Sequence, residues 1–391
     1  MSSPTLDTLR FLRGWLRPRT RLRSRQLMLE TGGGRSLPDG PGGAVPVRAT
    51  SGRSVPATLL ETPSPDGRPA DPVTGWVVLH GVTRPGRSHP SMVRFAQALA
   101  TTGGRVLIPE IPEWTRLELA PDRAQEIIRG AVEWLATDPG TRPGGVVVVG
   151  FSFGAPQALL LASDPGLGSR VRGVVGWGGY ADLARTFAFH LTGEHEWNGQ
   201  HYRRDPDPYG RWVVGANALP LVAGFGDATP VADALRALAA HAGDHQIPAG
   251  DPALDSLKVS LRVGLPRRYR PLFDLFAPPA GQIPPADEAR QLVEIIIPAA
   301  RRAMPLLDPL RMIEGIRVPV RLLHARSDRL IPFTETLALA DALERRAPDL
   351  KTGVTGLFGH SGGAGDGGPL TQLQSGAGFL KALRTVFETS A

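Results

Sequence analysis

The chain contains no cysteine, and this absence excludes several classes of chemistry. Without cysteine a protein has no disulfide bonds, no thiolate metal ligands and no thiol nucleophile. Any nucleophile in this protein must therefore be an oxygen or an amine. The sequence also lacks a run of about 18 apolar residues, the length that a membrane-spanning helix needs.

Lysine is scarce, with three residues among 44 basic ones, and the positive charge is unevenly distributed. Residues 1–35 carry eight arginines against Asp7 and Glu30, so most of the formal net charge of +7 lies in this segment. The remainder of the chain is close to neutral. Nucleic-acid binding by the main body is therefore not predicted.

The N-terminal segment predicts an amphipathic helix. Leucines recur at helical spacing over residues 5–17, at Leu6, Leu9, Leu12 and Leu16. The segment has neither the apolar region nor the small-residue cleavage site of a secretory signal. We expect a terminal helix that packs on the main domain of a cytoplasmic protein. The alternative is that residues 1–30 contact an anionic membrane surface, which would place the protein at the inner membrane face.

The most informative stretch is residues 146–154, which join a predicted strand to a predicted helix. Four consecutive valines, residues 146–149, fit a strand that is covered on both faces. A Gly-x-Ser-x-Gly motif follows, with Ser152 at its centre, and a helix-like segment comes next. A serine on such a sharp turn exposes its hydroxyl, and the flanking glycines leave room for neighbouring backbone. A dinucleotide-binding turn would need a glycine at position 152, so we favour a serine nucleophile.

Strands alternate with helices around this motif, which predicts a doubly wound, mostly parallel α/β sheet. We expect strands at residues 75–81, 105–109, 146–149, 171–179, 318–324 and 352–357. We expect helices at residues 90–101, 121–136 and 334–346, and from residue 374 onward. Residues 45–50 and 53–61 are predicted to form a hairpin.

The alternation stops near Asp182 and resumes near Asp308, which predicts an insertion between two strands of one sheet. The expected organisation is a basic helical arm and linker (1–44), a first core part (45–182), an inserted cap or lid (183–308) and a second core part (309–391). Such an insertion starts at the carboxyl edge of the sheet, where open α/β sheets bind ligands. Its aromatic residues are expected to line an apolar acyl pocket: Phe187, Phe189, Trp197, Tyr202, Tyr209, Trp212, Phe273 and Phe276.

A serine nucleophile needs a general base, and a carboxylate must orient that base. Asp328 follows the strand predicted at 318–324, and His360 lies in a glycine-rich loop near the C-terminus. The order Ser152, Asp328, His360 is the order that such a sheet requires. Asp182 is the alternative acid. Two further histidines, at positions 80 and 324, are expected to be structural.

Four segments together resemble the α/β-hydrolase family: residues 79–81, 150–154, 327–332 and 359–360. The resemblance covers residues 45–182 and 309–391. It implies that Ser152 is the nucleophile, Asp328 the orienting acid and His360 the base. It also implies an oxyanion hole built from the backbone N–H groups of Phe153 and Val82, which would stabilise the tetrahedral intermediate.

The expected function is a serine hydrolase that cleaves carboxylic esters or related acyl compounds through an acyl-enzyme. The alternatives are an acyltransferase on the same fold and a non-catalytic binding protein that retains the fold. The expected partner is a small acyl substrate, with no organic cofactor and no metal. Possible metal ligands in the insertion match no standard spacing: His190, Glu194, His195, Glu196 and His201.

Overall fold

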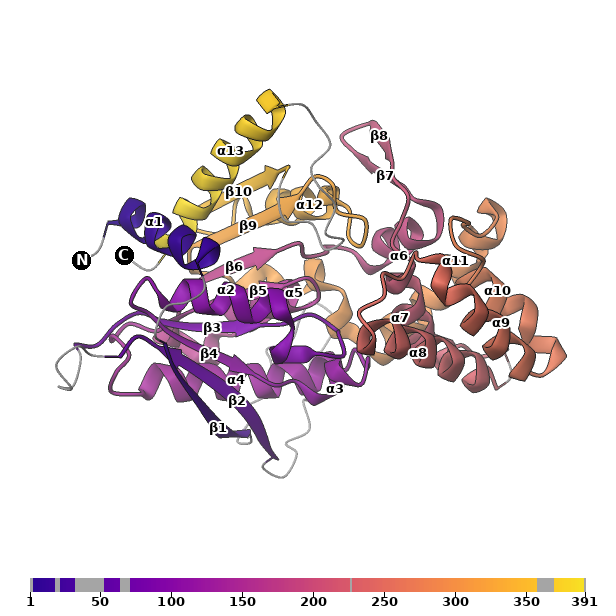
Figure 1. Ribbon diagram of the computed structural model, residues 1–391, viewed down its shortest axis with the longest axis horizontal. Coiled ribbons are helices and arrows are strands. Elements are labelled where there is room, and N and C mark those ends of the chain that lie inside the picture. The colour runs from indigo at the N-terminus through magenta and orange to yellow at the C-terminus, as the bar shows by residue number, and fades with distance from the viewer. Residues whose placement is uncertain are drawn as a thin grey trace.

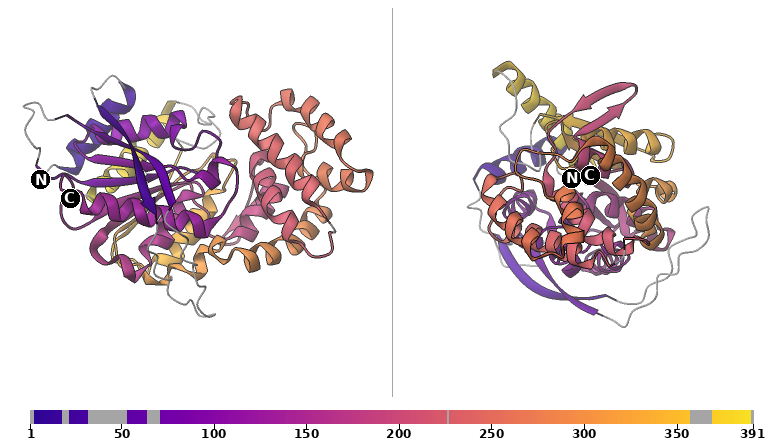
Figure 2. Two further views of the ribbon diagram at one scale, coloured as in Figure 1. Left: turned by 90° about the horizontal axis from the view of Figure 1, so that it is seen from below. Right: turned by 90° about the vertical axis from the view of Figure 1, so that its right-hand side faces the viewer.

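The computed structural model describes residues 3–17, 22–31, 53–63, 71–225, 227–356 and 369–389, with side chains of the last segment described from residue 377. A twisted sheet with helices on both faces forms one body, and a helical lobe lies beside it (Figure 1). The same two parts lie side by side in the left view of Figure 2.

The sheet has eight strands in the order β1-β2-β4-β3-β5-β6-β9-β10. Strands β3, β4, β5, β6, β9 and β10 run parallel, and β2 is antiparallel both to β4 and to the edge strand β1. The strand bounds are β1 (Arg23–Thr31), β2 (Arg53–Glu61), β3 (Gly75–Leu79), β4 (Arg105–Pro109), β5 (Val146–Phe151), β6 (Val171–Trp177), β9 (Val320–Ala325) and β10 (Leu350–Thr355). This order confirms the predicted doubly wound, mostly parallel sheet.

The valine run of β5 lies in the middle of the sheet because its side chains are buried on both faces. Val146 and Val148 point into one core cluster, and Val147 and Val149 point into the other. One face is covered by α4 (Pro121–Thr137), α5 (Gly154–Ala162) and α12 (Phe333–Leu343). The other is covered by α1 (Pro4–Leu16), α2 (Pro90–Ala100) and α13 (Pro369–Glu388).

The sheet begins earlier in the chain than the sequence indicated. Residues 23–31 were expected in the arm and linker, but they form edge strand β1, which pairs antiparallel with β2. Most side chains of β1 are exposed and two are arginines, so the segment lacks the apolar alternation that signals a strand. Residues 45–50, the predicted hairpin partner of β2, lie outside the described residues.

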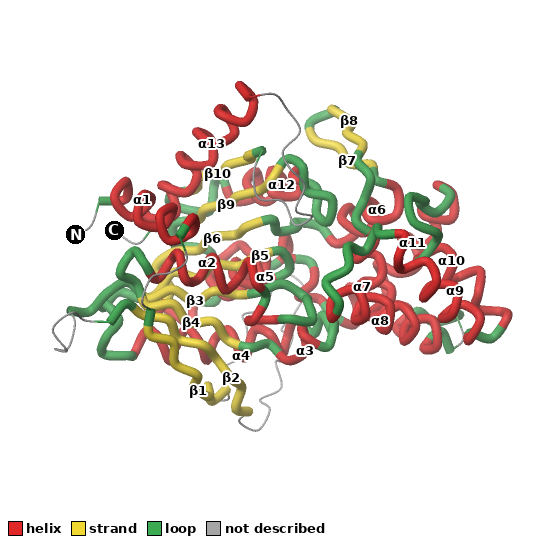
Figure 3. Tube along the Cα trace, viewed as in Figure 1, coloured by secondary structure: helices red, strands yellow, loops and turns green. Residues whose placement is uncertain are grey.

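The insertion leaves the sheet after β6 and returns before β9, and these two strands are neighbours. It is mainly helical (Figure 3). Its elements are α6 (Leu183–Thr192), the hairpin β7 (Glu194–Trp197) and β8 (Gln200–Arg203), α7 (Pro208–Ala218), α8 (Thr229–Asp244), α9 (Asp255–Gly264), α10 (Arg270–Phe276) and α11 (Ala286–Ala303).

Most aromatic residues of the insertion do not line a substrate pocket, which corrects the expectation from sequence. Five of them are fully buried inside the lobe: Phe187, Phe189, Trp212, Phe273 and Phe276. Four of them, all but Phe189, belong to the hydrophobic cluster that continues from the lobe into one face of the sheet. The indole N–H of Trp212, for example, donates to the carbonyl of Phe276 at 3.0 Å. Of the expected set, only Tyr209 borders the cavity described below.

The crossing of β5 and α5 leaves no room for a side chain at Gly150. An ideal Cβ at this position would lie 2.7 Å from the Cα of Ala155, against backbone that cannot move aside. At Gly154 a Cβ would lie 2.8 Å from the carbonyl oxygen of His80, at the end of β3. The two glycines therefore allow the start of α5 to pack directly on two central strands.

We expect Gly150→Ala to lower the free energy of unfolding by about 1–3 kcal/mol or more, because the added methyl group meets backbone. Gly264→Ala is the matched control: Gly264 ends α9, and a Cβ there has no heavy atom within 4 Å. Urea denaturation of both variants would test the expectation. Equal stability of the two variants would contradict it.

Candidate active site

Ser152 occupies the turn between β5 and α5 in a left-handed backbone conformation, with φ at +53°. This conformation is uncommon for a residue that is not glycine, and it persists only where the surroundings enforce it. Here the N–H of Ser152 donates to the carbonyl of Trp177 at 2.8 Å, which ties the turn to the end of β6. The turn brings Ser152 to the wall of a cavity of about 1130 Å³.

The cavity lies between the sheet and the insertion, and both contribute residues to it. From the core it is lined by Ser152 and by the β3–α2 loop (residues 80–89), including Val82. From the insertion it is lined by residues 205–209 before and within α7, and by residues 246–252 after α8. The insertion therefore lies at the same edge of the sheet as Ser152, and the volume is ample for a small organic ligand.

Two backbone N–H groups beside Ser152 are available for a ligand. Phe153 follows Ser152 at the start of α5, and Val82 lies in the β3–α2 loop. Within the described chain, neither N–H group donates a hydrogen bond to another protein atom. The loop is also close to the serine, because a Cβ added at Gly81 would lie 3.5 Å from the Ser152 hydroxyl oxygen.

The insertion holds the β3–α2 loop in place. The hydroxyl of Tyr209, from α7, donates to the carbonyl of Val82 at 3.0 Å. Burial raises the pKa of Tyr209, so its hydroxyl keeps the proton that it donates. Nearby, the guanidinium of Arg84 pairs with Asp244 at the end of α8 at 2.8 Å. These contacts could not be read from the sequence, because they join segments more than 120 residues apart.

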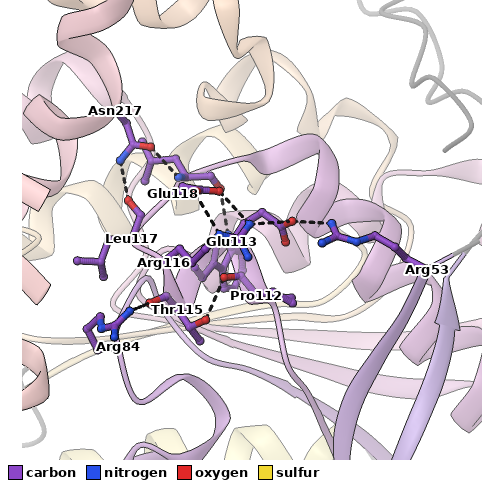
Figure 4. Close-up of polar contacts among 11 residues, drawn as sticks. Arg53, Arg84, Pro112, Glu113, Thr115, Arg116, Leu117, Glu118 and Asn217 are labelled. Atoms are coloured by element: carbon purple, nitrogen blue, oxygen red, sulfur yellow. Dashed lines mark hydrogen bonds and ion pairs between the residues drawn. The ribbon is translucent and has the colours of Figure 1, made fainter. Parts of the chain in front are cut away.

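A second set of hydrogen bonds joins the same loop and α7 to residues 115–119 (Figure 4). Arg84 donates to the carbonyl of Thr115, just after β4, at 3.0 Å. The amide of Asn217, in α7, donates to the carbonyl of Leu117 at 2.8 Å and accepts from the N–H of Leu119 at 3.0 Å. The segment that contains α3 (Pro112–Thr115) therefore bridges the core and the insertion.

His80 is a fully buried histidine at the base of this loop. Its Nε2 accepts from the N–H of Ile111 at 3.3 Å, so the ring proton is on Nδ1, which donates to the carbonyl of Gly81 at 2.7 Å. The ring meets Trp114 edge to face. Burial lowers the pKa of His80 to about 4, so the imidazole is neutral near pH 7. These contacts assign His80 a structural role in shaping the loop.

Asp328 lies in the β9–α12 loop (residues 326–332), at the same sheet edge. Its side chain is buried, and Oδ1 accepts from the N–H groups of Leu330 and Ile331 at 2.8 and 3.1 Å. Its Oδ2 lies 3.6 Å from Nε2 of His324. Leu330, two residues later, lines the cavity. His360 lies outside the described residues, so its approach to Asp328 and Ser152 stays a prediction.

Asp182, the alternative acid, is engaged at the base of the insertion. Its Oδ1 accepts from the N–H of Arg185 at 2.8 Å and so caps α6. Its Oδ2 accepts from Arg301 at 2.9 Å, which links the two ends of the insertion. The buried carboxylate of Glu335 accepts from the N–H of Asp182 at 2.8 Å. These interactions give Asp182 a structural task.

The histidines and glutamates of the insertion that were considered as metal ligands do not form one site. His190 is buried and shares a 2.7 Å hydrogen bond with the carbonyl of Leu330. His195 stacks on the ring of Tyr202 and meets the ring of Phe333 edge to face. Among the described residues, no group of three or more histidine, aspartate or glutamate side chains is arranged to hold a metal ion.

Comparison of the sequence with protein-family models and with curated proteins gives no match. Among solved structures, the chain is similar to a ligand-bound form of the rice cell wall degrading esterase LipA from Xanthomonas oryzae. The identity is 13% and the TM-score 0.53, over 100% of this chain and 96% of that chain. Together with the strand order, this likeness identifies the α/β-hydrolase fold.

Two other solved structures are similar over most of this chain. Candida antarctica lipase A in its closed state has 11% identity and a TM-score of 0.46, over 88% of this chain and 74% of that chain. Pyrococcus horikoshii acylaminoacyl peptidase has 11% identity and a TM-score of 0.46, over 96% of this chain and 43% of that chain. The chain thus spans less than half the length of the acylaminoacyl peptidases that it matches.

The buried, neutral His80 predicts a loss of stability in mild acid. Its pKa is about 4 in the folded protein and near 6.5 in the unfolded chain, so between these values the unfolded chain binds more protons. The contribution of His80 to the free energy of unfolding therefore decreases as pH falls from 6.5 toward 4. At pH 5 it is about 2 kcal/mol lower than at neutral pH. We expect His80→Asn to remove this part of the pH dependence in urea denaturation at pH 7.5 and 5.

His201→Asn is the control, because His201 is an exposed histidine of β8. An equal flattening of the pH dependence in both variants would show that the effect does not come from His80. A flattening confined to His80→Asn supports the neutral buried imidazole.

Proposed function

We propose that this protein is a serine hydrolase that cleaves carboxylic esters or related acyl compounds through an acyl-enzyme. One observation carries the proposal: Ser152 sits on a strained turn at a cavity wall, near two backbone N–H groups that have no acceptor among the described residues. A serine hydroxyl beside backbone N–H groups that can bind an oxyanion is the arrangement that acyl transfer requires.

The proposed reaction has two halves. His360 takes the proton of Ser152 as the hydroxyl oxygen attacks the ester carbonyl, and the N–H groups of Phe153 and Val82 stabilise the resulting oxyanion. His360 then returns the proton to the departing alcohol, which leaves the acyl group on Ser152. Water attacks this acyl-enzyme with His360 again as base, and the acid is released with the serine restored.

Asp328 is the proposed orienting acid. Two backbone N–H groups hold its Oδ1 and fix the carboxylate in a buried position, which suits a group that must hold a histidine in one orientation. The carboxylate of Asp182 is committed to the cap of α6 and to Arg301. Asp328 is therefore the better candidate for orienting a histidine.

Residues 183–308 are proposed to act as a cap that also positions part of the catalytic machinery. Tyr209 and Asp244 bind the β3–α2 loop, which carries one of the two proposed oxyanion donors. A displacement of the cap would release this loop. Closure of the cap and completion of the oxyanion hole are therefore proposed to be coupled.

We expect Ser152→Ala and His360→Ala each to abolish nearly all turnover of a soluble p-nitrophenyl ester, because triad members act as a unit. Asp328→Asn should lower kcat by about 10⁴-fold through the wrong histidine tautomer. Asp182→Asn should mainly lower stability. Initial rates, together with labelling of Ser152 by a fluorescent phosphonate, would measure these effects.

Several outcomes would revise the proposal. Full turnover in Ser152→Ala would refute it, and a greater loss of kcat in Asp182→Asn than in Asp328→Asn would reverse the choice of acid. An acyl product on an added alcohol, formed in preference to the free acid, would indicate an acyltransferase. A folded wild-type protein that no phosphonate labels would indicate a binding protein.

We further propose that α1 contacts anionic membrane surfaces. Leu9 and Leu16 are 60% and 72% exposed, and Arg10, Arg13 and Arg17 lie among them in the sequence. This combination of exposed leucine and arginine suits the interface of an anionic bilayer. None of the described helices has the length and apolar character needed to cross a bilayer.

The membrane proposal predicts that the protein sediments with phosphatidylglycerol vesicles at low salt and is released as salt screens the charges. Leu9→Ser with Leu16→Ser should weaken sedimentation and spare hydrolysis of a soluble ester. Val259→Ser, at an equally exposed site on α9, is the control. A wild-type protein that stays in the supernatant at low salt would refute the contact.

A further inference from the structure

The cavity at Ser152 extends away from the insertion and reaches the N-terminal helix. Phe11, Leu12 and Trp15 of α1 line the same cavity as Ser152. The helices α1, α2 and α13 lie next to one another on one side of the sheet (Figure 1). A segment that the sequence predicted only as a terminal arm therefore forms part of the wall of the candidate active site.

Aromatic rings connect Ser152 to α1 without interruption. Phe151, which precedes Ser152, meets Phe95 of α2 edge to face at 4.8 Å between ring centres, and Phe95 meets Phe11 at 5.3 Å. On the other side, Trp177 stacks on Phe151 at 5.8 Å and contacts Phe379 of α13 at 6.0 Å. All five rings border the cavity, so this half of it presents an apolar surface.

The other half of the cavity has a different character. The insertion contributes carboxylates at Asp205, Asp207 and Asp251 and amides at Gln246 and Gln282, together with apolar side chains such as those of Tyr209 and Ile247. The lining from α1, α2 and α13 is thus mostly apolar and aromatic, whereas the lining from the insertion is mixed and includes carboxylates, and Ser152 lines the same cavity. An ester with one extended apolar group would place that group under α1, because burial there removes the most apolar surface from water.

α1 is anchored firmly enough to act as a fixed wall. Gly14 packs against α2, where an added Cβ would lie 3.1 Å from the Cα of Ala98. The guanidinium of Arg94 donates to the carbonyl of Trp15 at 2.7 Å and lies 4.7 Å from the centre of its ring. The hydroxyl of Thr101 donates to the carbonyl of Arg10 at 3.1 Å.

We propose that the wall formed by α1, α2 and α13 binds a long, unbranched alkyl chain of the ester substrate, and that Leu12 limits the length of chain accepted. Leu12 is half-buried and lies on the α1 side of the cavity, so its bulk occupies space that a longer chain would fill. The inference rests on the proposed ester hydrolysis, and it assigns the choice of substrate to the N-terminal helix.

The experiment compares Leu12→Trp and Leu12→Ala with the wild type on p-nitrophenyl esters from acetate to palmitate. Leu12→Trp should lower kcat/KM for the longest chains by at least about tenfold relative to acetate, and Leu12→Ala should shift the preference toward longer chains. Leu9→Trp is the matched control, because Leu9 lies on the same helix, is exposed and does not line the cavity.

A second series varies the alcohol, from ethyl to hexadecyl acetate, with released acetate as the readout. A chain-length shift in the acyl series or in the alcohol series supports the proposal and tells which part of the ester occupies the wall. If Leu12→Trp changes kcat/KM by the same factor for every ester in both series, the assignment is overturned. It is also overturned if Leu9→Trp produces the same shift in chain-length preference as Leu12→Trp.

A binding measurement separates this inference from the proposed reaction. In Ser152→Ala, brominated dodecanoate should quench tryptophan fluorescence, and Leu12→Trp should weaken the affinity several-fold. If the wild type does not hydrolyse the esters but the fatty acid binds as expected, the proposed reaction is refuted and the alkyl site stands. If the wild type hydrolyses the esters but the Leu12 variants change neither the affinity for the fatty acid nor the chain-length preference, the alkyl site is refuted and the proposed reaction stands.

Discussion

The structure depends on the close backbone contact between the start of α5 and the ends of β3 and β5. Gly150 and Gly154 allow this contact, because a methyl group at either position would meet main-chain atoms. Ser152 adopts a left-handed conformation on the turn between these elements. The start of α5 also lies against the base of the β3–α2 loop, because a Cβ at Gly154 would lie 2.8 Å from the carbonyl oxygen of His80. The strain at Ser152 is compensated by burial of the strand and helix on either side of it.

The second requirement is that loops from separate strands are held together at one edge. Parallel strands bring their carboxyl ends to the same side, so the loops after β3, β5 and β9 all reach the cavity. The insertion then fixes two of them: Tyr209 binds Val82, and His190 binds Leu330. The helical lobe is therefore joined to the site by directed hydrogen bonds, in addition to packing.

The cavity derives its apolar character from a part of the chain where the sequence did not suggest it. Aromatic residues of the insertion are buried in the core of the lobe, because a helical body must bury apolar surface before it can present any to a ligand. Most of the aromatic lining comes instead from the sheet, from α2 and α13, and from Phe11 and Trp15 of α1. Substrate selection is thus inferred to lie on the side of the cavity opposite the insertion.

The sequence by itself determined the sheet class, the turn at Ser152 and the position of the insertion, because valine runs, paired glycines and the strand–helix alternation are local patterns. It also indicated Asp328, which follows a buried strand. Only the tertiary structure decided the pairing of β1 with β2, the structural engagement of Asp182 with Arg301, and the entry of α1 into the cavity wall. Each of these depends on contacts between segments distant in sequence. The local pattern of residues does not indicate which distant segment a residue will contact.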